Sequence, residues 1–191
     1  STLLSIPYPS TNTPPDKLLR QLGWSLILFR SILHYRFYFD KGLPVRGSIA
    51  FGPAVVEDDV FAGQCILHAY EDAQKLELAA VVLHPTAEKE FNELFGDDRD
   101  LSRSYNVPFR NSDSEQRLVL LPTVEKKDYS PWLPFDIRGY VAEAFLKHNK
   151  ALSPQDRVKL DNTEMCLRFF KLTCPHLFED AALGQTTSPP S

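Results

Sequence analysis

Hydrophobic positions in the first part of the chain recur at two spacings, which predict a strand followed by a long helix. The apolar run at residues 2–7 predicts a short strand, and the Pro, Ser, Thr and Asn residues after it predict a loop. From Asp16 to near Tyr38, hydrophobic residues recur every three or four positions, as expected for a helix with one buried face. The residues of that face are Leu18, Leu22, Leu26, Phe29, Leu33 and Phe37, with Leu19, Ile27 and Leu28 beside them.

The middle of the chain, at residues 42–85, predicts the elements around which the rest is arranged. Residues 45–52 form an apolar run that predicts a strand, and residues 53–60 predict a tight loop. Residues 61–71 predict a helix, and the continuous apolar run at residues 78–83 predicts a strand that is covered on both sides. The expected packing face of the helix comprises Ile66, Leu67, Ala69, Tyr70 and Ala73.

Three glycines in this segment place demands on the backbone. Gly47 and Gly52 lie in or at the end of the apolar strand, where a missing side chain indicates a bulge or a close backbone neighbour. Gly63 falls in the first turn of the predicted helix, where it costs roughly 1 kcal/mol relative to alanine. We therefore expect another backbone or a ligand to lie close to Gly63.

The rest of the chain alternates between short apolar runs and amphipathic segments. Pro85 suits the first turn of a helix and Gly96 suits its end, so a helix is expected between them, at residues 86–95. Residues 105–110 and 117–121 predict a hairpin joined by the turn sequence Asn-Ser-Asp-Ser. The C-terminal predictions are a polar connection at residues 126–134, amphipathic helices at residues 137–148 and 155–170, and a disordered tail at residues 181–191.

Strands that alternate with helices and then form a hairpin are typical of an α+β fold. We therefore predict a ferredoxin-like, mostly antiparallel sheet with helices packed on one face, plus C-terminal helices. The character of the sequence changes after Pro122, which divides the chain into three predicted parts. These are a globular domain at residues 1–124, a helical extension at residues 125–180 and the disordered tail at residues 181–191.

Composition restricts the partners and the compartment. The 191 residues are 43% hydrophobic and carry a net charge of −4, which argues against binding to nucleic acid or to an anionic membrane. No apolar run reaches the roughly 18 residues that span a bilayer, and the first residues do not form a signal peptide. Cys65, Cys166 and Cys174 lack disulfide or zinc spacing, so we expect buried thiols in a reducing cytoplasm.

Familiar catalytic motifs are absent from the sequence. There is no G-x-S-x-G elbow and no Walker or Rossmann phosphate loop. The acidic run at residues 57–59 is expected to be a solvated loop face, although Asp59 suits contact with a ligand equally well. The histidines lack the paired spacing of a metal site and are expected on helix faces or in loops. They are His34, His68, His84, His148 and His176.

Two motifs in the central segment resemble a known family. Arg-Gly-Ser-Ile-Ala-Phe-Gly at residues 46–52 is similar to a strand motif of the nucleotide cyclase homology domain, the catalytic fold of adenylate and guanylate cyclases. Phe-Ala-Gly at residues 61–63, followed by the apolar helix, resembles the next element of that domain. There, a glycine precedes the catalytic helix. The resemblance covers residues 1–124.

Three shorter matches point to one branch of this family. Pro-Val-Arg-Gly at residues 44–47 and Ala-Tyr-Glu at residues 69–71 resemble bacterial cyclases of Pycsar-type antiphage defence and their relatives. Lys-Leu-Asp-Asn-Thr at residues 159–163 resembles a segment near the end of the same proteins. These cyclases make cyclic pyrimidine nucleotides.

The resemblance implies an enzyme that converts a nucleoside triphosphate, UTP or CTP, to a 3′,5′-cyclic nucleotide and pyrophosphate. It also implies two Mg²⁺ or Mn²⁺ ions that bind the triphosphate, and a head-to-tail homodimer with sites shared between its subunits. In the family, two aspartates hold the metals, and both align upstream of Ser1. The chain is therefore expected to be part of a longer protein, or to be inactive.

The resemblance also assigns candidate substrate contacts. Asp59 lies near the family's base-selecting acid, and Arg110 matches the strand of the triphosphate-binding lysine, where a guanidinium also suits phosphate. Arg46 has two interpretations, because it either contacts a phosphate or pins its strand through hydrogen bonds. Leu67 and Glu71 stand where purine cyclases have Asn and Arg, and Glu71 cannot stabilise developing negative charge.

This departure supports a second hypothesis, in which a catalytically degenerate cyclase-like domain acts as a regulatory or dimerisation module. Two aspartates upstream of Ser1, in a strand and a hairpin, would favour the enzyme over the module. A third hypothesis is an RNA-binding α+β domain. The acidity of the chain and its lack of paired aromatic residues on one strand argue against RNA.

Overall fold

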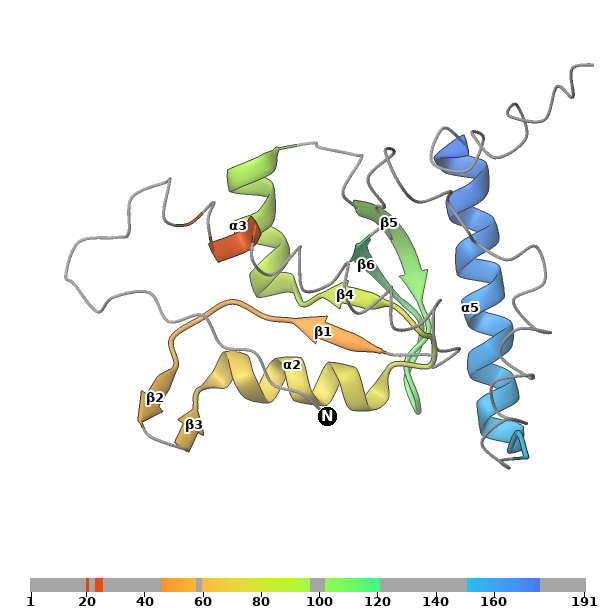
Figure 1. The fold of residues 1–191 in the computed structure, drawn as a ribbon, viewed down its shortest axis with the longest axis horizontal. Helices are drawn as coiled ribbons and strands as arrows, with labels where there is room; N and C mark the ends of the chain where they lie inside the picture. Colours follow the sequence, from red (N-terminus) through yellow and green to blue (C-terminus); the bar gives the residue numbers. More distant parts are fainter. Residues whose placement is uncertain are drawn as a thin grey trace, which may run out of the picture.

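The structure, a computed structural model, describes residues 20, 23–25, 46–57, 60–96, 102–120 and 151–175 (Figure 1). Several predictions concern segments outside these residues. They are the strand at residues 2–7, most of the helix that begins at Asp16, the helix at residues 137–148 and the tail at residues 181–191.

Four of the described strands form a sheet with the order β1-β4-β6-β5. These strands are β1 (Gly47–Ile49), β4 (Val81–Leu83), β6 (Glu115–Leu120) and β5 (Ser102–Val107). β1 runs parallel to β4, whereas β6 is antiparallel to both β4 and β5. The architecture is therefore mixed α and β with a mixed sheet, in agreement with the predicted α+β class.

A second, two-stranded sheet lies where the sequence predicts a tight loop at residues 53–60 and the start of a helix at residue 61. β2 (Val55–Glu57) and β3 (Val60–Ala62) pair as an antiparallel hairpin that projects past the end of β1 (Figure 1). The loop prediction was wrong at these positions, because β-branched residues such as Val55 and Val60 favour extended backbone.

Three longer helices complete the described part of the chain: α2 (Gln64–Lys75), α3 (Pro85–Phe95) and α5 (Pro154–Thr173). α3 begins and ends at the predicted positions, because the His84 side chain accepts from the Thr86 N–H and Gly96 adopts a φ of 61° after the last turn. α5 begins with a capping box between Ser153 and Asp156, and it extends past its predicted end. None of these helices is long and apolar enough to cross a membrane.

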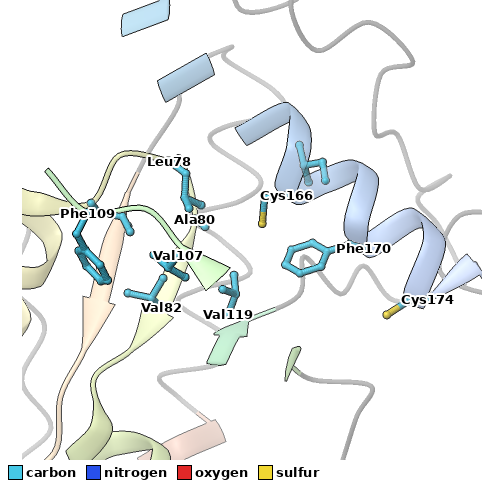
Figure 2. Packing of buried hydrophobic residues seen from close by; sticks show 11 residues of the cluster. Leu78, Ala80, Val82, Val107, Phe109, Val119, Cys166, Phe170 and Cys174 are labelled. Carbon is cyan, nitrogen blue, oxygen red and sulfur yellow. The ribbon is translucent and has the colours of Figure 1, made fainter. Parts of the chain in front are cut away.

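The two faces of the sheet pack against different helices. Val82 faces a core formed with α5 (Figure 2). Val81 and Leu83 face a second core, formed with α3 and Trp24. The prediction of a strand covered on both sides is confirmed for Val81–Leu83, which are all buried, but β4 begins three residues later than predicted. α3 and α5 thus lie on opposite faces, although the sequence predicts helices on one face, because a strand that is apolar on both sides needs cover on both sides.

The α5 core joins the last described helix to the middle of the sheet (Figure 2). Phe170 and Cys166 of α5 belong to one cluster with buried residues of the strands, and both are at most 2% exposed. The other members are Leu76, Leu78, Ala80, Val82, Val107, Phe109, Val119, Leu167 and Cys174. Two of the three cysteines are therefore buried thiols, as predicted, while Cys65 is partly exposed. The division of the chain near residue 124 stays a prediction.

The β5–β6 hairpin forms earlier in the sequence than predicted. β5 ends at Val107, because Pro108 has no N–H to continue the ladder. The Pro108 carbonyl instead accepts from the Glu77 N–H, and Phe109 forms an isolated bridge with Leu76. Residues 108–110 are thereby joined to the end of α2 rather than to β6.

Candidate functional site

Two of the three predicted substrate contacts lie in the described part of the chain. Arg46 immediately precedes β1, and Arg110 follows β5 in the turn toward β6. Asp59 lies outside the described residues, so its predicted contact with a base stays a prediction.

Arg46 binds the chain's own backbone. Its Nη1 donates a hydrogen bond of 2.8 Å to the carbonyl oxygen of Leu76, directly after α2. Leu76 is fully buried. This geometry agrees with the interpretation in which Arg46 pins the strand, and it leaves the phosphate contact a prediction.

Arg110 is held between two elements. Its Nε lies 2.8 Å from Glu77 Oε1, and its side chain is 39% exposed. With the Gln155 amide oriented to satisfy both of its polar atoms, Gln155 Oε1 also accepts from Arg110. Glu77 is 10% exposed, so this ion pair is half-buried and joins the β5–β6 turn to the segment after α2, while Gln155 joins the same turn to α5.

The structure brings both arginines to one short segment at the end of α2. Arg46 bonds to the Leu76 carbonyl, and Arg110 bonds to the Glu77 carboxylate. The Arg110 backbone N–H also donates to the Lys75 carbonyl, at 2.7 Å. A phosphate that bound here would have to displace Glu77 from Arg110, so we expect the pair to oppose anion binding in the free protein.

Polar contacts at three positions along α2 join this helix to β1 and its flanking residues. Arg46 reaches Leu76 at one end, Ser48 Oγ donates to Asp72 Oδ2 at 3.3 Å in the middle, and Cys65 Sγ contacts the Gly52 carbonyl at the other end. None of the described α2 side chains is fully buried. Figure 1 shows α2 lying beside β1.

Gly63 sets the angle between the hairpin and α2. It is the N-cap of α2 rather than a residue of its first turn, and no side chain caps the helix there. A Cβ at this position would lie 2.6 Å from the Pro53 carbonyl oxygen and 2.8 Å from Ala54 Cα. The expected close neighbour of Gly63 is therefore the chain's own backbone at residues 53–54.

The hairpin and the first half of α2 expose large apolar side chains. We call these residues the hairpin surface: Val55, Val60, Phe61, Leu67 and Tyr70. Leu67 is 53% and Tyr70 56% exposed, so these two residues do not belong to the packing face predicted for the helix. Ile66, Ala69 and Ala73 are half-buried instead. Glu71, at the position of the family's arginine, pairs with Lys75 on the exposed side of α2.

A pair of stacked histidines is the polar feature that the sequence does not reveal. His68 of α2 lies on His84, with ring centroids 4.4 Å apart and planes inclined by 21°. His68 lies on a helix face and His84 in the connection before α3, as predicted, but nothing in their spacing indicates contact. The contact between the two histidines follows from the topology, because the β1–β4 pairing places the end of β4 beside α2.

Titratable groups from two elements, α2 and β6, act on His84. Burial lowers the pKa of its imidazole, and the nearby Asp72 carboxylate opposes this effect. His68 and Arg117 lower the pKa further, while Glu115 raises it. The Nδ1 atom accepts from the Thr86 N–H at 3.3 Å, which requires an unprotonated Nδ1. The neutral imidazole therefore acts as the N-cap of α3.

Within the residues that the structure describes, no three His, Cys, Asp or Glu side chains gather closely enough to hold a metal ion. The described side chains thus do not form a site for the implied Mg²⁺ or Mn²⁺. Comparison with known proteins finds no matching family model, no similar curated protein and no similar solved structure.

Proposed function

We propose that this chain is a ferredoxin-like, nucleotide cyclase-related domain whose hairpin surface pairs with a second copy of the chain. The observation that carries this proposal is the exposure of the hairpin. Val55 is 59% and Val60 62% exposed on one side of the ribbon, and Phe61 is 46% exposed on the other.

An isolated two-stranded hairpin is marginally stable in water, so a hairpin with apolar side chains on both faces needs a partner. The packing of Gly63 on Pro53 and Ala54 fixes where the hairpin projects from the domain. A fixed apolar projection loses little conformational entropy when it docks, which favours association. Leu67 and Tyr70 extend the same exposed region onto α2.

The activity that we propose for the paired protein is cyclisation of a nucleoside triphosphate, UTP or CTP, in the bacterial cytoplasm. The product would be a 3′,5′-cyclic nucleotide that signals in antiphage defence, and Mg²⁺ or Mn²⁺ would assist the reaction. This part of the proposal rests on the motifs at residues 46–52 and 61–71. Arg110 is its candidate triphosphate contact, with Glu77 as a competing partner.

The second candidate function is a catalytically degenerate module that regulates or dimerises. Two observations favour it. Both arginines already have acceptors within the chain, and Leu67 and Glu71 replace the polar pair that orients ribose and phosphate in purine cyclases. The two candidates share the hairpin-mediated pair, and they differ in whether any triphosphate is converted.

Incubation of the full-length protein with each of the four nucleoside triphosphates and Mn²⁺ separates the candidates. A cyclic pyrimidine product supports the enzyme. If none of the four is converted while the protein still pairs, the module is supported and the enzyme is ruled out.

Pairing is tested by sedimentation of the wild-type chain and of Phe61→Glu and Val60→Glu variants. Each variant places a carboxylate in the hairpin surface, so we expect the dissociation constant of the pair to rise at least about tenfold. Lys89→Glu, on the exposed side of α3, is the matched control and should leave association unchanged. Association that is insensitive to both hairpin variants would overturn the proposal.

A further inference from the structure

α5 carries a second apolar line, on the side opposite its buried face. Val158, Met165 and Leu172 are 51%, 55% and 82% exposed, and each follows the previous one after two helical turns. We call these three residues the α5 stripe. The buried face comprises Thr163, Cys166, Leu167 and Phe170, which lie about half a turn away from the stripe.

The spacing of the α5 stripe suits contact with another helix. Residues repeated every seven positions stay on one side of a helix that winds gently around a partner. The stripe spans about 21 Å at 1.5 Å per residue. α5 is also the outer layer over this face of the sheet among the described elements (Figure 1).

The stripe is its own complement when two helices lie antiparallel. A twofold axis beside Met165 would place the two Met165 side chains together, and Val158 of each copy would meet Leu172 of the other. A small side chain then faces a larger one at both ends. This is the self-complementary pattern of an isologous contact, in which one surface patch serves both subunits.

Charges beside the stripe favour the same arrangement. Asp161 precedes Met165 by four residues and Arg168 follows it by three, so both lie on the same flank. In an antiparallel pair, Arg168 of one copy comes within about one residue rise, 1.5 Å along the axis, of Asp161 of the other. In a parallel pair, these charges would lie on opposite flanks. Arg168 already pairs with Glu164, but this contact is at the surface and exchanges at little cost.

We propose that α5 docks antiparallel against α5 of a second copy of this chain, with the twofold axis at Met165. This contact is separate from the hairpin surface, since it uses the last described helix and the opposite side of the helix from the core. Two such twofold contacts in one chain would link pairs into larger assemblies.

The test is sedimentation in a Phe61→Glu background, which weakens association through the hairpin and so separates the two proposals. We expect this protein to remain a dimer, and Met165→Glu to raise its dissociation constant at least about tenfold. Lys171→Glu adds the same carboxylate about 100° around the helix from Leu172 and should change the constant less than about twofold. Circular dichroism of each variant shows that the fold is retained.

Charge reversal tests the direction of docking. Asp161→Arg and Arg168→Asp should each weaken the dimer, and the double variant should restore it. A protein that is monomeric in the Phe61→Glu background overturns the proposal, as does a dimer that tolerates Met165→Glu. A Met165-dependent dimer that the double reversal does not restore overturns the antiparallel register.

Discussion

His68 stacks on His84 with ring centroids 4.4 Å apart, and this contact joins α2 to the N-terminus of α3. Protonation of His84 would remove the acceptor that caps α3 and would place a second charge near Arg117. Asp72 and Glu115 offset part of this repulsion, but burial dominates and lowers the pKa of His84 from 6.5. The stack therefore contains His84 as a neutral imidazole.

This relationship predicts a pH dependence of stability. Between the lowered folded pKa and 6.5, the unfolded chain binds more protons at His84 than the folded chain, so the free energy of unfolding falls as the pH falls through this window. Urea unfolding at a series of pH values measures the slope. His84→Asn, which can still cap α3, should flatten it, whereas His68→Gln should retain most of it. An unchanged slope in His84→Asn would contradict the assignment.

Gly63→Ala should destabilise the protein by about 1–3 kcal/mol, because the new methyl group meets backbone atoms that cannot move aside easily. Its nearest neighbour would be the Pro53 carbonyl oxygen at 2.6 Å. Gly47→Ala is the matched control, since its methyl group would lie 3.9 Å from Val81 Cγ2 in ordinary contact. Chemical denaturation compares the two, and equal stabilities would show that the hairpin does not depend on Gly63.

The hydroxyl group of Thr163, in α5, is expected to contribute to the free energy of unfolding. Its Oγ1 accepts from the Ala79 N–H at 2.8 Å and is almost fully buried. Thr163→Val keeps the shape but leaves that N–H unpaired, so we expect a loss of about 1–3 kcal/mol in the free energy of unfolding. Thr163→Ser retains the hydroxyl and should lose about 0.8 kcal/mol for the missing methyl group. A valine variant at least as stable as the serine variant would exclude this role.

The Arg110–Glu77 pair predicts opposite effects on nucleotide affinity. If Arg110 binds a triphosphate, Glu77→Gln weakens its internal partner and should strengthen nucleotide binding, while Arg110→Ala should weaken it. Titration with a fluorescent triphosphate measures both. Unchanged affinity in both variants would remove Arg110 from the substrate contacts and would support the module over the enzyme.

Local signals in the sequence account for much of the described fold. The limits of α3 follow from Pro85 and Gly96, because each acts on its own neighbours. The burial of residues 81–83 follows from their continuous apolar character. Trp24, in contrast, is fully buried but lies off the predicted apolar face. Its burial was not predictable from local spacing, because its neighbours in the α3 core come from distant parts of the chain.

The candidate site was less accessible to sequence analysis, because its contacts are set by tertiary structure. The convergence of Arg46 and Arg110 on residues 76–77 depends on how β1 and the β5–β6 turn pack around α2. The end of β5 could have been found from Pro108, whose missing N–H is visible in the sequence.

The backbone groups that precede β4 bond to side chains from α5. Asn162 Nδ2 donates to the Glu77 carbonyl at 2.9 Å, and Thr163 accepts from Ala79. During synthesis, residues 77–79 leave the ribosome long before Asn162 and Thr163. The apolar face of the sheet that α5 will cover also leaves before α5 does. The apolar face of the sheet therefore stays exposed to solvent in the nascent chain until α5 has been synthesised. We expect chaperones that bind exposed apolar surfaces to act on this protein until then.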